Sequence, residues 1–458
     1  MKSISSRLAE FAAELRYDKI PQPARREAKR FLLDSIGCAL AALDNQDMQS
    51  AYRYIQGIGG ADQASIIGYG TRTNMPNAAL MNALLIRAMD YNDIYWEKDP
   101  AHPSDIIPAA LAPAEFKGAS GIDMIVGIVI AYELEMRMCL AAAPGIREVG
   151  WHHASLTQWV SPLVAGRMLG LSPDELVAAV GISGSSHFTL GGVVAGKLTN
   201  MKNTADPMAT EAGVRAALLA ATGYTGPGQV FEGKEGVFEV VSNVKWDADS
   251  MLGGLGEEFL ITDCGYKAFP TEALTHQPIT AALELMKEER IDPHAVEQVL
   301  IKTTTRGADI LSDPSKYNPT TKETADHSLP YCIAVAIAKG NVLPSDFEEE
   351  TLKDPFVREL LLKINVKADP EIDALFPKVK RAIVSITTRD GNTYKKQEDH
   401  AKGRAERPMS DEELIAKFRA NAGGVLSGKQ LDRLIQMTLN LEDVGNIRDY
   451  ISLLRRGN

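Results

Sequence analysis

The chain has 458 residues, of which 45% are hydrophobic and 24% are charged, and its formal net charge is −11. A chain of this length exceeds one ordinary hydrophobic core, so we expect two domains. The acidic balance argues against general nucleic-acid binding, because proteins of that kind carry a basic face. A small anionic ligand stays compatible with it, since a few local lysines can outweigh a distant negative surface in a closed cleft.

The sequence predicts a cytoplasmic protein with no membrane partner. Its first ten residues are already amphipathic and lack the apolar core of a secretory signal. The most apolar segment, 124–136, is short and contains Glu133 and Glu135, so we do not expect it to span a bilayer. The four cysteines are far apart and form no Cys-x-x-Cys pair, which favours buried thiols in a reducing compartment over disulfides or metal–thiolate sites.

Residues 1–264 are predicted to form a helical domain. Apolar residues recur there at spacings of three and four, and Ser172 with Glu175 has the pattern of a capping box at a helix start. The predicted helices include 26–43, 82–89, 109–140, 161–169 and 205–222.

The pattern changes near Gly265, and residues 265–400 are predicted to form a smaller α+β domain. β-rich runs occur at 296–305, 362–366, 382–388 and 393–396, and the last two flank Arg-Asp-Gly-Asn, which is typical of a hairpin turn. Helical stretches are predicted at 272–289, before the first run, and at 328–339, between the first two runs. Residues 401–458, with a second capping box at Ser410, return to helix and are expected to pack on the first domain.

The stretch 89–104 is the most informative part of the chain. The helical run 82–89 enters it and another, 106–114, leaves it, so Asp90, Asp93 and His102 should lie at a break between two buried helices. Polar groups in such a place have a desolvation cost, which requires a compensating reason.

Further polar residues stand in conspicuous surroundings. His152 follows Gly150-Trp151, and His276 lies just before Pro278. His153 should point to a different side of a helix and is the weaker candidate. Lys202 precedes the alanine-rich helix, and Lys267 lies where the domains should join. Most histidines and lysines are structural or solvated, but here the small and apolar neighbours keep a role in ligand binding open beside the structural one.

Two kinds of site lack support. Gly191 and Gly196-Lys197 match most of a phosphate-binding loop, but Leu198 stands where a Ser or Thr must coordinate magnesium. Asp90 and Asp93 offer too few oxygens for a hard cation, so we expect no metal. Histidines, lysines and aspartates without a cofactor motif favour proton chemistry beside a carboxylate, with the cations stabilising an enolate-like charge.

At these residues the chain resembles the MmgE/PrpD family over almost its full length. The resemblance is carried by Phe-Leu-Leu-Asp-Ser-Ile-Gly-Cys at 31–38, Met-Asp-Tyr-Asn-Asp at 89–93, His-Pro-Ser at 102–104, Gly-Trp-His at 150–152, Met-Lys at 201–202, Tyr-Lys-Ala-Phe-Pro at 266–270 and Ser-Leu-Pro-Tyr at 328–331. No one of these motifs is specific, but their order and spacing together are.

The resemblance implies a mainly α fold. A large all-helical domain is formed by N-terminal and C-terminal segments, with a smaller α+β lid inserted between them. It also implies a cofactor-free site between the domains and a homodimer. The positions that match the family's site are Asp90, His102, His152, Lys202 and Lys267, with Tyr331, His276 and Asp93 as substrate-binding candidates.

The resemblance implies a hydro-lyase of the 2-methylcitrate dehydratase type, acting on a small hydroxy di- or tricarboxylate. His102 would move the proton, oriented by Asp90. The chain departs from the family's patterns at Ile94 and over 95–101, so a decarboxylase, epimerase or isomerase of a related carboxylate, such as cis-aconitate or iminodisuccinate, stays open. A non-catalytic helical binding protein is a third reading, disfavoured because the ionisable residues of the site are all present.

Overall fold

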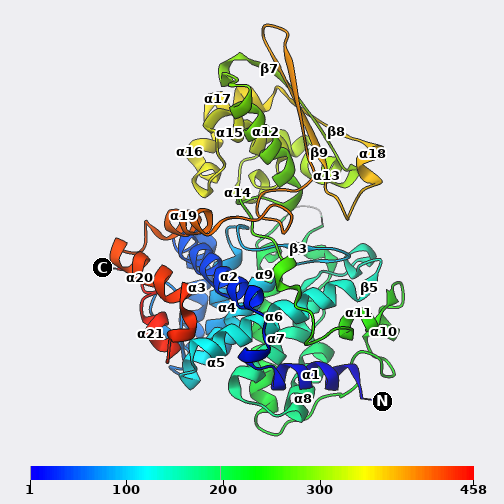
Figure 1. The fold of residues 1–458 in the computed structure, drawn as a ribbon, viewed down its shortest axis with the longest axis vertical. Coiled ribbons are helices and arrows are strands. Elements are labelled where there is room, and N and C mark those ends of the chain that lie inside the picture. Colours follow the sequence, from blue (N-terminus) through cyan, green and yellow to red (C-terminus); the bar gives the residue numbers. More distant parts are fainter. Residues whose placement is uncertain (1, 196–197, 458) are drawn as a thin grey trace. The chain divides into compact units, whose positions relative to one another are not determined.

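The computed structural model describes residues 2–195 and 198–457 (Figure 1). The chain divides into two units: Met1–Cys264 together with Ser410–Asn458, and Gly265–Met409. The Gly-rich near match to a phosphate-binding loop ends on Gly196 and Lys197, which lie outside the described residues.

Helices build the first unit, as predicted. They are α1 (Ile4–Glu14), α2 (Gln22–Ala41), α3 (Gln46–Ile58), α4 (Met75–Arg87), α5 (Ile107–Lys117), α6 (Gly121–Leu140), α7 (Ala154–Leu169), α8 (Pro173–Ser186), α9 (Met201–Ala220), α10 (Val237–Val240), α11 (Ala248–Leu252), α19 (Asp411–Ala422), α20 (Gly428–Leu439) and α21 (Ile447–Ser452). Short antiparallel strand pairs connect loops of this unit: β1 (Ala64–Ser65) with β2 (Arg72–Thr73), β3 (Tyr95–Trp96) with β4 (Pro100–Ala101), and β5 (Ala142–Ala143) with β6 (Lys245–Trp246).

Local sequence accounts for where these helices begin and end. Ser172 caps α8, and its side chain forms the predicted capping box with Glu175. The predicted helical run 109–140 is divided into α5 and α6 because Gly118 adopts a left-handed φ of 67° and Ser120 caps the second helix.

Small residues let the central helices of this unit approach closely. Helix α9 packs against α7, α4 and α8. A Cβ on Gly213 of α9 would collide with Ser161 of α7, and the Ser161 hydroxyl donates to the Ala209 carbonyl across the same contact at 3.0 Å. The alanine-rich composition of α9 is therefore a packing requirement, and it fixes the position of the residues at the start of that helix.

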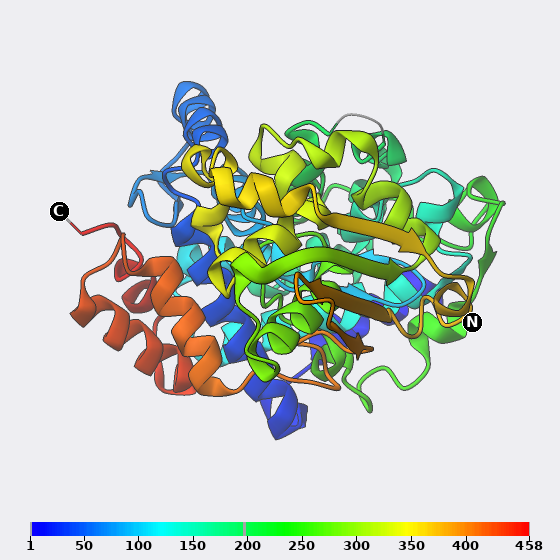
Figure 2. The same cartoon turned by 90° about the horizontal axis from the view of Figure 1, so that it is seen from above.

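The C-terminal segment packs on the N-terminal helices of the first unit. Helices α19 and α20 contact α2, and Figure 2 shows them, in orange and red, beside the blue N-terminal helices. A Cβ on Gly37 of α2 would lie 3.1 Å from the Phe418 ring, so a small residue is needed where the helices cross. The C-terminal segment is thus part of the same core as residues more than 370 positions earlier in the chain.

The second unit is an α+β structure around a four-stranded sheet of order β10-β9-β7-β8. β7 (Val296–Thr303) pairs antiparallel with β9 (Ala382–Thr388) and parallel with β8 (Ile364–Ala368), and β9 forms the predicted hairpin with β10 (Thr393–Glu398). Helix α12 (His276–Glu288) packs against β9 and β10, and α15 (Leu329–Lys339) against α12 and β8 (Figure 1). The shorter helices are α13 (Thr305–Leu311), α14 (Lys322–Ala325), α16 (Glu349–Leu352), α17 (Pro355–Leu361) and α18 (Pro370–Asp373). The mainly α fold with a small α+β region is confirmed.

The second unit extends through Met409, past the predicted boundary at residue 400. The Tyr266 N–H donates to the Gly403 carbonyl at 2.8 Å, and Arg407 forms ion pairs with Glu398 and Glu284. These contacts hold 401–409 against the second unit, whereas composition alone shows only that the helical pattern resumes at Ser410.

All four cysteines are buried thiols. Within the described part of the chain, every helix is too short or too polar to cross a lipid bilayer.

Candidate active site

The polar stretch 89–104 lies in the loop between α4 and α5, as predicted. Asp90, Asp93 and His102 are 2%, 1% and 7% exposed, although they lie outside regular helices. Asp90 has a φ of 48°, in the left-handed region that side-chain-bearing residues seldom adopt. Backbone strain of this kind costs about 1–3 kcal/mol and is characteristic of functional sites.

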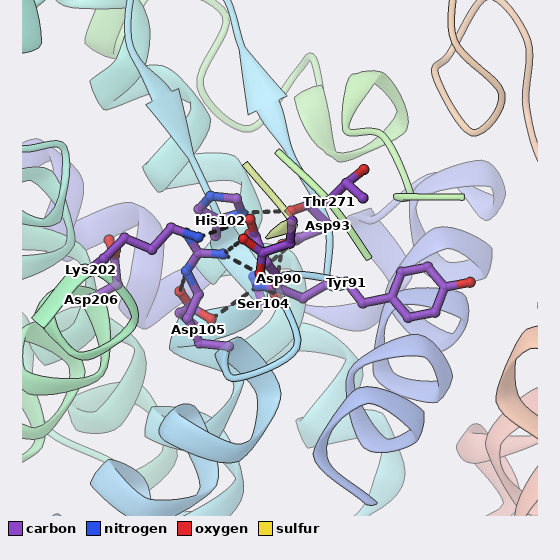
Figure 3. Close-up of polar contacts among 12 residues, drawn as sticks. Asp90, Tyr91, Asp93, His102, Ser104, Asp105, Lys202, Asp206 and Thr271 are labelled. Carbon is purple, nitrogen blue, oxygen red and sulfur yellow. Dashed lines mark hydrogen bonds and ion pairs between the residues drawn. The ribbon is translucent and has the colours of Figure 1, made fainter. Parts of the chain in front are cut away.

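Asp90 holds two cations, one with each carboxylate oxygen, and Figure 3 shows one of them, Lys202, beside it. Arg87, at the end of α4, donates to Oδ1 at 2.5 Å, and Lys202, in the first turn of α9, donates to Oδ2 at 2.9 Å. The Nε atom of Arg87 also lies 3.5 Å from the carboxylate of Asp105. Burial alone would lower the pKa of Arg87, but the charges of Asp90 and two further carboxylates outweigh burial and raise it.

His102 is fixed by a backbone carbonyl. Its Nδ1–H donates to the carbonyl oxygen of Asp93 at 2.6 Å, and because a carbonyl can only accept, Nδ1 must carry the proton. In the neutral ring the lone pair is therefore on Nε2, the form required of a base. The sequence predicted that Asp90 orients this histidine; at Nδ1, the structure places the carbonyl of Asp93.

The Asp93 carboxylate is held by Ser104. The Ser104 N–H and hydroxyl donate to its two oxygens at 3.0 and 2.6 Å. Burial raises the pKa of Asp93 to about 6, and the bonds from Ser104 oppose that shift.

Asp93 should make the stability of the protein depend on pH. Its pKa of about 6 exceeds the ordinary value of 3.8, so between these values the folded state binds more protons and stability falls as pH rises. We expect Asp93→Asn to remove this component. The unfolding free energy of the wild type relative to that variant should fall by about 2 kcal/mol from about pH 4 to about pH 7. Urea unfolding at several pH values measures it, and a pH-independent difference would contradict the raised pKa.

His152 is fixed in the opposite tautomer. It lies just before α7, and the Ala154 N–H donates to its Nδ1 at 3.2 Å, so the proton of the neutral ring is on Nε2. Burial, with the neighbouring His153 adding to it, lowers the pKa of His152 well below its usual value. His152 is therefore a neutral Nε2–H donor, whereas His102 offers an Nε2 lone pair.

His153 and Asp206 belong to the same cluster, although the sequence did not single out Asp206. The His153 ring centroid lies 3.9 Å from that of His152 and 5.7 Å from that of His102, and its Nε2 lies 3.4 Å from the Asp206 carboxylate. The expectation that His153 points elsewhere is wrong, because α7 begins only at Ala154 and helical spacing does not apply. Asp206 could have been found: it follows Lys202 by four residues, which places both on one face of α9.

Other residues of the cluster were also missed. Arg87 read as part of an apolar helix, and Asn92 and Asp105 read as loop residues. Asn92 donates to the Ser104 hydroxyl at 2.9 Å and to Asp105 at 3.1 Å, so it joins the two halves of the loop. Burial raises the pKa of Asp105 well above its usual range, and the Arg87 charge opposes that shift.

Among the described residues, His152, His153 and Asp206 form one group that could hold a metal ion, with ligand atoms within 4.8 Å of one another. The contacts fit protein pairing better. A metal on Nε2 of His152 would require the proton to move to Nδ1, where the Ala154 N–H already donates. The predicted absence of a metal stays a prediction.

Three predicted site residues belong to the second unit. Lys267 is buried. His276 begins α12, with its Nε2 3.3 Å from the Thr271 carbonyl, and the Tyr331 hydroxyl on α15 donates to the Asp346 carbonyl at 2.6 Å. Asp90, Asp93, His102, His152 and Lys202 all belong to the first unit. The part of Lys267, His276 and Tyr331 in substrate binding stays a prediction.

Comparison with known proteins covers nearly the whole chain. Residues 6–248 match the MmgE/PrpD N-terminal domain, and residues 269–443 match the MmgE/PrpD C-terminal domain. The cis-aconitate decarboxylase-like protein oryM of Aspergillus oryzae is 27% identical, with 99% of this chain and 97% of that protein aligned. The cis-aconitate decarboxylase of Homo sapiens is 26% identical over 99% of this chain and 95% of its own. The 2-methylcitrate dehydratase of Salmonella typhimurium is 26% identical over 96% and 95%.

Proposed function

Because this chain belongs to the MmgE/PrpD family, we propose that it is a lyase that dehydrates a small hydroxy di- or tricarboxylate of the 2-methylcitrate type. The observation that supports this most directly is the pair of opposite tautomers. His102 offers a base and His152 a neutral donor in one buried cluster with Lys202. Removing a proton beside a carboxylate needs such a base, together with groups that stabilise the negative charge that develops.

In the proposed reaction, Nε2 of His102 takes a proton from the carbon next to a substrate carboxylate. The Asp93 carbonyl, already bonded to Nδ1, stabilises the imidazolium that forms. Lys202 stabilises the enolate-like charge, and the Nε2–H of His152 binds a carboxylate oxygen. The C–O bond to the β-hydroxyl then breaks as the C=C bond forms. The hydroxyl leaves as water with the proton from His102, and the enzyme returns to its starting state.

In this scheme the role of Asp90 is to hold Lys202 in place. Its carboxylate lies 2.9 Å from the ammonium and is held on its other oxygen by Arg87, so it places the lysine and keeps it charged. An ammonium has three hydrogen-bond donors, so Lys202 can bind other oxygens besides that of Asp90.

A decarboxylase is the second candidate, and it is supported by the relatives named cis-aconitate decarboxylase. In that reaction a C–C bond to a carboxylate breaks, carbon dioxide leaves, and the electron pair left on carbon takes a proton from protonated His102. Epimerisation would use the same base, with the proton returned to the opposite face. These reactions need the same cluster and differ in the bond that breaks.

Product analysis separates the candidates. The purified protein is incubated with 2-methylcitrate, citrate, cis-aconitate or iminodisuccinate in D2O and followed by NMR. Loss of water with a new alkene signal supports the dehydratase, whereas release of carbon dioxide or retention of every atom with inverted configuration supports one of the alternatives. Neither a product nor deuterium exchange with any of the four would favour a non-catalytic binding protein. A homodimer and a cytoplasmic location are part of the same proposal, and sedimentation tests the first.

A further inference from the structure

A buried lysine of the C-terminal segment reaches the site loop. Lys417 of α19 lies with its Nζ 2.7 Å from Oδ1 of Asp34 in α2, and the same ammonium donates to the backbone carbonyl of Tyr91 at 2.7 Å. It also lies 3.9 Å from the centroid of the Tyr91 ring. One ammonium thus joins three segments that are far apart in the chain.

An ion pair in this position requires an explanation beyond stability. Lys417 is 6% exposed and Asp34 2% exposed, so both charges are removed from water. Burying such a pair has a desolvation cost that well-packed apolar residues would avoid. Burial lowers the pKa of Lys417, but the charge and hydrogen bond of Asp34, together with Cys38 and Tyr91, outweigh burial and raise it, so the lysine is an ammonium. An apolar residue in its place could fill the space but could not bind the Tyr91 carbonyl.

The bound carbonyl is next to the strained residue of the site. Tyr91 follows Asp90, whose left-handed φ of 48° aims its carboxylate at Lys202 and Arg87. The Asp90 N–H donates to the Arg87 carbonyl at 3.0 Å, so the strained residue is held on its N-terminal side by α4 and on its C-terminal side by Lys417. Figure 3 shows the Tyr91 side chain pointing away from the carboxylate of Asp90. Strained conformations persist only where surrounding contacts overdetermine them.

We propose that Asp34 and Lys417 are positioning residues of the site, holding the Tyr91 carbonyl so that Asp90 keeps its left-handed backbone and presents its carboxylate to Lys202. Residues of α2 and α19 would then influence the site through the ammonium of Lys417, which Asp34 pairs with and which binds the Tyr91 carbonyl. The expected effect on turnover rests on the proposed function, but the expected effect on the contact between Asp90 and Lys202 does not.

The test measures the chemical accessibility of Lys202 in variants that are shown to be folded. Lys417→Met is compared with Lys29→Met. Lys29 binds the Glu442 carboxylate at 2.9 Å and the Leu439 carbonyl at 2.7 Å, so it also joins α2 to the C-terminal segment. These partners lie on the C-terminal segment and not on the site loop. Each variant is labelled with acetic anhydride, and modification of Lys202 is followed by mass spectrometry. Circular dichroism establishes the folded state.

We expect Lys417→Met to raise the labelling rate of Lys202 at least fivefold or so, because Asp90 relaxes and releases it, and to lower kcat about tenfold or more with a smaller change in KM. Lys29→Met should leave the labelling rate of Lys202 and kcat within about twofold of the wild type.

If Lys417→Met does not fold, the double variant Asp34→Leu/Lys417→Met removes both charges, and it should fold and show the same increase in labelling. Unchanged labelling in a folded variant, or an equal increase in Lys29→Met, would overturn the proposal. Absence of activity in the wild type would overturn the proposed function alone, because labelling still reports on Lys202.

Discussion

Replacing His102 with asparagine is expected to lower kcat by a factor of about 100 to 10 000 and to leave substrate binding nearly unchanged. The asparagine amide nitrogen stands where Nδ1 stands in histidine, so it can still donate to the Asp93 carbonyl that accepts from His102 at 2.6 Å. The variant therefore keeps the contact that places the side chain and loses only Nε2. A loss confined to turnover is the signature of a group used in the transition state rather than in the ground state.

Steady-state kinetics on the substrate identified by product analysis, with calorimetric binding of the same substrate to the variant, measure the two effects separately. His294→Asn is the matched control, since His294 is an exposed histidine of the second unit, and it should leave both quantities unchanged. Equal losses in kcat and in affinity would remove the role of base from His102 and would make it a binding residue.

The sequence alone predicts those helix starts and turns that depend on a few neighbouring residues. Capping boxes at Ser172 and Ser410 mark helix starts in the structure, and the Arg-Asp-Gly-Asn turn joins β9 to β10. Each of these depends on a few neighbouring side chains and the backbone they contact, so no tertiary information is needed. The break between α4 and α5 was equally readable, because an apolar pattern ends and resumes around a polar run.

The order of the strands could not be read in the same way. β7 lies between β9 and β8, and β8 is parallel to it although the five helices α13 to α17 separate them in sequence. Alternation along a strand shows which face is buried but not which strand is its neighbour. That choice is made by the helices that cover the sheet, and their packing is a property of the whole unit.

In the candidate site, too, some residues could be predicted from local sequence and others depend on tertiary contacts. Asp90 and His102 were singled out because they lie where an apolar helical pattern breaks, and His152 because it follows Gly150-Trp151 before a helix. Arg87 was missed because it continues such a pattern: it occupies a helical position among apolar residues, and only the structure shows the carboxylates around it. His153 was given too little weight because a helical direction was assumed for a residue that lies just before the helix. Spacing along the chain does not reveal the partners of a buried charge that come from other elements, as Lys202 does for Asp90.

Loss of Arg87 should lower the stability of the protein strongly. We expect Arg87→Met to lower the free energy of unfolding by about 3–5 kcal/mol, because it leaves a buried carboxylate without its cation. Methionine has a similar length, so little packing is lost. Asp90 would keep Lys202 at 2.9 Å, whereas Asp105 would lose the guanidinium 3.5 Å away and retain the amide of Asn92.

The pH dependence of this loss identifies its cause. The pKa of Asp105 is already raised by burial, and removing the Arg87 charge takes away what opposes that shift. A carboxyl with a raised pKa penalises folding where it is ionised, and the penalty fades as pH falls through the raised value. The stability deficit of Arg87→Met, measured by denaturant unfolding, should therefore be largest near pH 8 or so and smaller near about pH 5.

Arg215→Met is the control. It removes an exposed arginine paired with Glu211 on α9 and should change stability by no more than about 0.5 kcal/mol. A deficit for Arg87→Met that is the same at both pH values would mean that lost packing, and not an unpaired carboxylate, destabilises the variant.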